Sequence, residues 1–116
     1  MQGKAYILQS GQKTTNDLVY GAKFTTLGYA KTTISIENVG EGSGVDYTIR
    51  GYPVEGFPAN YLLGSGSVTV PGTLKVETLM DAWSQIDVGC KSHDLNLSGV
   101  VTVSSVATVY VAGKRR

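Results

Sequence analysis

The stretch from Gly99 to Val111 constrains the fold more than any other part of the chain. Valine or alanine occupies most of its odd positions, whereas threonine, serine or tyrosine occupies most of the even ones. This period of two is typical of a β-strand with one buried face. The stretch is longer than an average strand of about five or six residues. We therefore expect it to cross a whole sandwich, or to bend between two sheets near Ser104 and Ser105.

Similar patterns predict strands along the rest of the chain. Ile34 and Ile36 alternate with polar residues over 31–38, and a second alternation covers 45–50. The glycines of Gly40–Gly44 predict a hairpin turn between these two strands, because hairpin turns need residues with positive φ. Further strands are predicted over residues 4–9, 17–27 with a bend at Gly21, 67–70, 74–78 and 84–92.

Prolines and glycines mark the predicted connections. Pro53 ends the strand before it, since proline cannot donate to a ladder, and residues 54–66 are predicted to form a long surface loop. The dipeptide Pro71-Gly72 predicts a tight turn, and residues 78–83 have room for one helical turn. Together the patterns predict an all-β fold, an antiparallel β-sandwich of jelly-roll or Ig-like type with about seven or eight strands and little or no helix.

The length and charge of the chain limit its organisation and its partners. A chain of 116 residues suits one domain, which we assign to residues 17–116, and the polar stretch 10–16 predicts an N-terminal arm over residues 1–16. Ten basic and nine acidic residues leave a net charge of +1. This charge favours neither nucleic acid nor an anionic membrane as a partner. No apolar run is long enough to span a bilayer.

Cysteine and histidine each occur once, which limits the available chemistry. Cys90 cannot form a disulfide within the chain, and it follows Ile86 and Val88 on the apolar phase of its strand. We expect it to be buried as a small hydrophobic residue, where a thiol is inert. One histidine and one cysteine cannot supply a zinc site. We expect no metal and no cofactor.

No segment has the spacing of a catalytic or ion-binding motif. Ser92, His93 and Asp94 are the residue types of a hydrolase triad, but sequence neighbours do not converge as a triad requires. The segment Asp94–Gly99 begins like a calcium loop, yet its twelfth position is Ser105 rather than a glutamate. The glycine-rich segments match no phosphate-binding pattern. We expect no catalytic residues.

Two groups of residues are candidates for an interaction surface. Three aromatic residues lie in or beside the predicted loop, namely Tyr52, Phe57 and Tyr61, and three basic residues end the chain, namely Lys114, Arg115 and Arg116. The aromatic side chains either contact a protein or sugar, or anchor the loop on its own domain. The basic tail either contacts an acidic neighbour or is simply solvated.

Several segments between residues 31 and 116 together carry a family resemblance. They are Ile34-Ser35-Ile36-Glu37-Asn38 with Gly40, Tyr47-Thr48-Ile49-Arg50-Gly51, Trp83 with Ile86-Asp87-Val88 and Lys91-Ser92, Gly99-Val100-Val101-Thr102-Val103, and Gly113-Lys114-Arg115. In these segments the chain resembles small virion proteins of tailed bacteriophages. The resemblance implies a β-sandwich that oligomerises on a capsid or tail, and it implies no catalytic residues.

The leading functional hypothesis is a non-enzymatic virion structural protein that decorates or stabilises a capsid by self-association and docking on a protein lattice. The expected partners are further copies in a homo-oligomer and the major capsid or another virion protein. The expected location is the virion, assembled in the host cytoplasm. The alternative is a carbohydrate-binding or adhesion module that uses the loop aromatics. An enzyme ranks third, because it would need His93 in a deep pocket beside Asp87 or Glu77.

Overall fold

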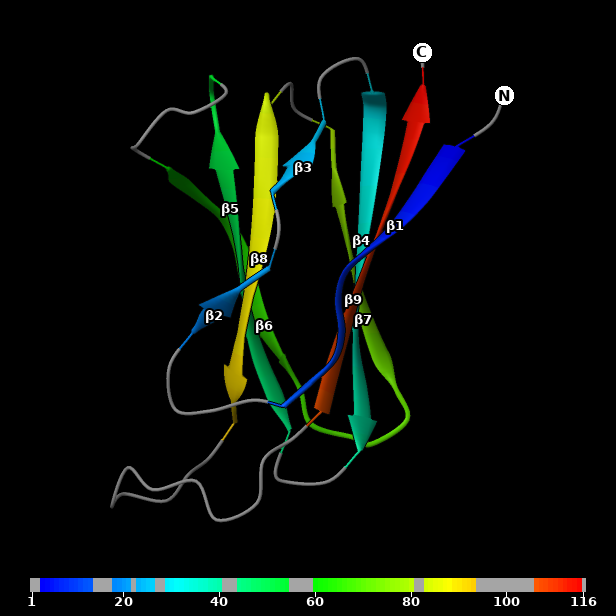
Figure 1. The fold of residues 1–116 in the computed structure, drawn as a ribbon, viewed down its shortest axis with the longest axis vertical. Helices are drawn as coiled ribbons and strands as arrows, with labels where there is room; N and C mark the ends of the chain where they lie inside the picture. Colours follow the sequence, from blue (N-terminus) through cyan, green and yellow to red (C-terminus); the bar gives the residue numbers. More distant parts are fainter. Residues whose placement is uncertain are drawn as a thin grey trace.

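Nine strands in two antiparallel sheets make up the described part of the chain (Figure 1). The computed structural model describes residues 3–13, 18–21, 23–26, 29–40, 44–54, 60–80, 83–93 and 106–115. The strands are β1 (Gly3–Lys13), β2 (Val19–Tyr20), β3 (Phe24–Thr25), β4 (Tyr29–Gly40), β5 (Val45–Tyr52), β6 (Tyr61–Val68), β7 (Leu74–Leu79), β8 (Gln85–Ser92) and β9 (Val106–Arg115). No helix occurs in these ranges. The predicted all-β sandwich is confirmed.

One sheet has four strands in the order β1-β9-β4-β7. The other has the order β2-β8-β5-β6, with β3 also paired to β8. Figure 1 shows the two layers side by side, with β5 and β8 in one and β4 and β9 in the other. The core between them is formed by apolar side chains of both layers, chiefly Ile34, Ile36, Val45, Tyr47, Ile49, Ile86, Val88, Cys90, Ala107, Val109 and Val111.

The last strand has the face that its alternation predicts. Ala107, Val109 and Val111 are fully buried, whereas Tyr110 is exposed. β9 pairs with β1 on one side and with β4 on the other, so it lies inside its sheet. It continues to Arg115, beyond its predicted end at Val111. The predicted bend near residues 104 and 105 lies outside the described residues.

The predicted hairpin between residues 31–38 and 45–50 is wrong. Both strands exist with the expected buried faces, but β4 pairs with β7 and β9 whereas β5 pairs with β6 and β8. Gly40 and Gly44 do have positive φ, at 142° and 131°. They belong to a connection that crosses from one layer to the other. Alternation shows that a strand is half-buried, but it does not identify the neighbouring strand.

The predicted loop over residues 54–66 is wrong in its second part. Tyr61 already begins β6, which pairs with β5. Gly64 and Gly66 interrupt the alternation that would have revealed this strand. A Cβ on Gly66 would lie 2.7 Å from the Tyr47 hydroxyl oxygen, so the glycine leaves room for the close approach of that side chain.

The predicted turn at Pro71-Gly72 is confirmed. The Thr73 N–H donates to the Val70 carbonyl over 3.2 Å, and Gly72 has a φ of 79°. This geometry suits a type II turn, which needs a residue with positive φ at its third position. The turn joins β6 to β7 and therefore links the two sheets. The predicted helical turn over 78–83 is wrong for its described residues, because β7 continues to Leu79.

The N-terminal part of the chain contributes edge strands to both sheets. β1 pairs with β9, with two register shifts, and it includes the strand predicted over residues 4–9. The predicted strand over 17–27 divides into β2 and β3 around Gly21, and both pieces pair with β8. That an arm over residues 1–16 reaches onto a neighbouring molecule stays a prediction.

Candidate functional site

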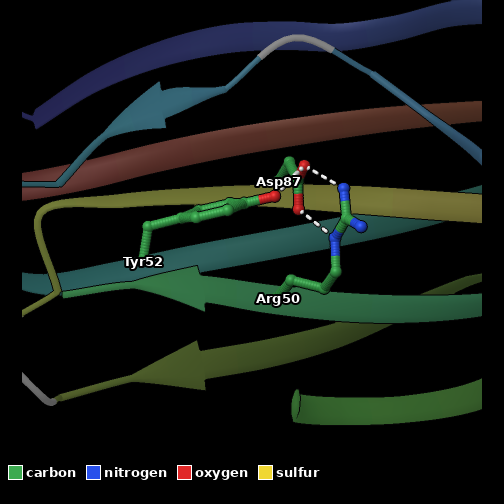
Figure 2. A network of polar contacts seen from close by, with 3 residues as sticks. All are labelled: Arg50, Tyr52 and Asp87. Atoms are coloured by element: carbon green, nitrogen blue, oxygen red, sulfur yellow. Dashed lines mark hydrogen bonds and ion pairs between the residues drawn. The ribbon is translucent and has the colours of Figure 1, made fainter. Parts of the chain in front are cut away.

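A polar cluster lies on the face of the five-stranded sheet that points away from the core (Figure 2). Arg50 of β5 and Asp87 of β8 are directly opposite each other in the ladder. The Arg50 Nε donates to Asp87 Oδ1 over 2.9 Å, and the guanidinium also donates to Oδ2. The Tyr52 hydroxyl donates to the same Oδ2 over 2.9 Å. Three charge-assisted hydrogen bonds therefore converge on one carboxylate.

Aromatic rings and a second cation surround this cluster. The Arg50 guanidinium carbon lies 3.3 Å from the centre of the Tyr20 ring, and Lys23 Nζ lies 4.3 Å from the centre of the Tyr52 ring. Both distances suit cation–π attraction. Tyr20 also covers Gly89, where a Cβ would lie 2.7 Å from the ring. The cluster thus ties the short strand β2 to β5 and β8.

The geometry of the cluster is that of a structural network. Both oxygens of Asp87 accept hydrogen bonds from this chain, and its side chain is only 3% exposed. The hydrogen bond to Asp87 raises the pKa of Arg50, and burial followed by the hydrogen bond to Asp87 raises the pKa of Tyr52. Both groups are held in their protonated forms. The carboxylate is not exposed to a substrate.

A second polar group joins Asp46, Ser67 and His93. His93 Nδ1 lies 2.7 Å from Asp46 Oδ1, and the Ser67 hydroxyl donates to the same oxygen over 2.6 Å. A hydrolase triad has the histidine between the serine and the carboxylate. Here the carboxylate lies in the middle, so the arrangement does not activate the serine. The His93 side chain is 28% exposed and contacts Asp46. Asp87 instead accepts from Arg50 and Tyr52, and Glu77 accepts from Tyr47.

The described residues contain no group of three or more His, Cys, Asp or Glu side chains placed to hold a metal ion. Asp94, the third residue of the Ser92-His93-Asp94 segment, lies outside them. In the same part of the chain no helix is long and apolar enough to cross a membrane.

Cys90 has the environment that its position on the apolar phase predicts. It is a free cysteine, 2% exposed, among the core residues between the sheets. Burial raises the pKa of its thiol from 9.0 to about 12. Because the thiolate is the reactive form, this thiol is inert in the folded protein.

We expect Cys90 to react with a water-soluble disulfide reagent far more slowly in the native protein than in protein unfolded by urea. The folded pKa exceeds the unfolded one, so the contribution of Cys90 to stability is complete below about pH 9 and is lost as the pH rises toward 12. Urea unfolding at pH 8 and pH 11 checks this, because Cys90→Ala should lose less stability between the two. Equal thiol reaction rates in folded and unfolded protein would contradict the assigned burial.

The structure separates the six residues predicted to form an interaction surface. The prediction for Tyr52 is wrong, because the residue is 4% exposed and its hydroxyl donates to Asp87. Tyr61 is 56% exposed and its ring packs against Trp83, with 5.6 Å between ring centres. Phe57 and Arg116 lie outside the described residues. Lys114 and Arg115 belong to β9, where their backbones pair with Gly3 and Tyr29.

An exposed apolar strip lies on the outer face of the four-stranded sheet. It consists of Leu74, Val76 and Tyr110, which are 52%, 48% and 39% exposed. Ser35 of β4 is opposite both Val76 of β7 and Tyr110 of β9 in the ladders, so Val76, Ser35 and Tyr110 form one row across the sheet. Sequence patterns predict the strand at 74–78, but not that it is an edge strand with exposed apolar side chains. This strip is a candidate protein-binding surface.

The two-layer all-β fold places the chain in a structural class that known proteins share. No family model matches the chain, and no curated protein matches it. Among solved structures it is similar to PBSX exported protein XepA, with a TM-score of 0.68 and 13% identity over 97% of this chain. It is also similar to SPBc2 prophage-derived protein YomS, with a TM-score of 0.63 and 10% identity over 97% of this chain.

These two similarities differ in how much of the known protein they include. This chain spans 37% of the XepA chain but 92% of the YomS chain. At such low identities the likeness shows a shared fold. It agrees with the β-sandwich that the resemblance to phage virion proteins implies.

Proposed function

We propose that this chain is a non-enzymatic structural protein of a bacteriophage particle. The observation that carries the proposal is the shared fold over 97% of this chain and 92% of YomS, a protein described as prophage-derived. The exposed apolar strip of Leu74, Val76 and Tyr110 supports it, since such a strip suits contact with another protein. The polar clusters of the described residues support it too, because neither has the geometry of a catalytic site. Both oxygens of Asp87 accept hydrogen bonds from its own chain, and Asp46 lies between Ser67 and His93.

Within the particle, we propose that the chain decorates or stabilises the capsid, docks on the major capsid or another virion protein, and associates with copies of itself. β1 is an edge strand of its sheet, and an open strand edge supports association with a neighbouring copy. The alternative of a sugar-binding surface built on loop aromatics is weakened, because Tyr52 is buried.

We expect antibodies against the chain to label phage particles whose genome encodes it. Particles are separated on a density gradient and probed by immunoblot and immunogold electron microscopy. The expected result is a signal that sediments with the particles and gold on their surface. As a control, antibodies that were first absorbed with the purified chain should give no label. A signal confined to the particle-free fractions would overturn the proposed function.

A further inference from the structure

The edge strand β7 presents backbone groups on one side that pair with no other described strand. It is the last strand of its sheet, and no strand among the described residues pairs with its other side. The Asn38 N–H donates to the Thr73 carbonyl over 3.0 Å, so that carbonyl points toward β4. Backbone groups alternate in direction along a strand. The N–H and C=O groups of Leu74, Val76 and Thr78 therefore point away from β4, to the open edge.

The side chains of β7 do not protect this edge in the usual ways. The pairing of β7 with β4 runs without a register shift, and β7 contains neither proline nor glycine. Leu74 and Val76 are exposed on the outer face. Lys75 and Glu77 are on the opposite face, and inward-pointing charges of one sign would discourage pairing. Here the two charges have opposite signs and lie two residues apart, so the edge complements a copy of itself.

Charge selects one register when two β7 strands pair antiparallel across a two-fold axis. Residues on the same face must oppose each other, so the axis lies at a residue, and axes at Val76 and Glu77 pair the longest part of β7. An axis at Lys75 places two lysines opposite each other, and an axis at Glu77 places two glutamates there. Like charges directly opposite are destabilising. An axis at Val76 instead places each Lys75 opposite the other copy's Glu77, twice per dimer.

We propose that a second copy of this chain pairs with β7 across a two-fold axis at Val76. The two four-stranded sheets then form one continuous sheet, and the open N–H and C=O groups of Leu74, Val76 and Thr78 gain partners. Glu77 Oε2 accepts from the Tyr47 hydroxyl over 2.7 Å within its own chain, which leaves Oε1 for the lysine of the second copy. The inference deepens the proposed function, and it rests on the self-association proposed there.

Charge reversal tests this register. We expect a wild-type dimer in sedimentation velocity at about 100 µM and low salt, the concentration range of a modest interface. Lys75→Glu and Glu77→Lys should each weaken the dimer about tenfold or more, because each replaces two attractive pairs by two repulsive ones. The double variant should restore it. Lys31→Glu is the matched control, since Lys31 is exposed on β4 away from the open edge and the charge change is the same.

A cross-link provides a test that does not depend on charge. The Cα atoms of the two Val76 residues would be about 5.5 Å apart, within disulfide range. Val76→Cys should therefore form a covalent dimer under mild oxidation, while Cys90 stays buried. Leu62→Cys, which is exposed on the edge strand β6, should remain monomeric.

The outcomes separate this inference from the proposed function. A monomeric wild type, a double variant that fails to dimerise, or equal cross-linking at residues 62 and 76 overturns the β7 pairing. Particles that carry the chain, together with any of these results, leave its proposed role as a structural protein of the particle standing. Absence of the chain from particles, with a β7 dimer in solution, overturns the function and supports the pairing.

Discussion

Asp87→Ala is expected to lower the free energy of unfolding by about 3 kcal/mol, at the lower end of the cost of breaking a buried ion pair. The substitution leaves the Arg50 guanidinium and the Tyr52 hydroxyl without their shared acceptor. The lower end applies because the Arg50 side chain is 24% exposed and water can solvate part of it. Urea denaturation followed by fluorescence of Trp83 measures the change.

Two variants serve as controls for Asp87→Ala. Asp87→Asn keeps an oxygen acceptor for the Tyr52 hydroxyl and should cost less than the alanine variant. Asp46→Ala removes a carboxylate whose partner His93 is 28% exposed, so it should cost about 1 kcal/mol or less. If Asp87→Ala cost no more than Asp46→Ala, the cluster would not hold the outer face together.

Gly44→Ala is expected to lower the free energy of unfolding by about 3 kcal/mol or more, from backbone strain plus overpacking. Gly44 has a φ of 131°, and an added Cβ would lie 2.8 Å from the Val68 carbonyl oxygen and 2.9 Å from the Thr69 Cα. These are backbone atoms, which cannot move aside as a flexible side chain does. Thermal and urea unfolding measure the loss.

Gly40→Ala is the matched control for this substitution. Gly40 has a similar φ of 142°, but no atom lies within 4 Å of an added Cβ. Its alanine variant should therefore show the strain alone, about 1 to 2 kcal/mol. Equal losses at the two glycines would show that the close approach of β6 to Gly44 has no energetic weight.

Strand faces were predictable from this sequence because they depend on local alternation. Ile34 and Ile36 in β4, and Cys90 in β8, are buried as their phases predict. Strand partners were not predictable, since pairing depends on contacts between distant segments. For this reason Gly40–Gly44 resembled a hairpin turn, although the chain crosses there between layers.

The outer-face cluster was missed for a related reason. Charged residues on the polar phase of a strand are normally solvated, and nothing local shows that Arg50 and Asp87 share one position in the ladder. The same register brings the Tyr52 hydroxyl onto Asp87 and removes this tyrosine from the surface. Long-range register therefore decides which polar side chains are buried. It also decides that β7 is an edge strand.

Amide hydrogen exchange reports on the proposed self-association through the open edge of β7. Exchange is followed by NMR at about 10 µM and about 500 µM, concentrations on either side of a modest dissociation constant. The amides of Lys75 and Glu77 point toward β4 and should be protected at both concentrations. The amides of Leu74, Val76 and Thr78 should become protected only at the higher one. Rapid exchange of these three amides at both concentrations, in a sample whose mass is above that of a monomer, would contradict association through this edge.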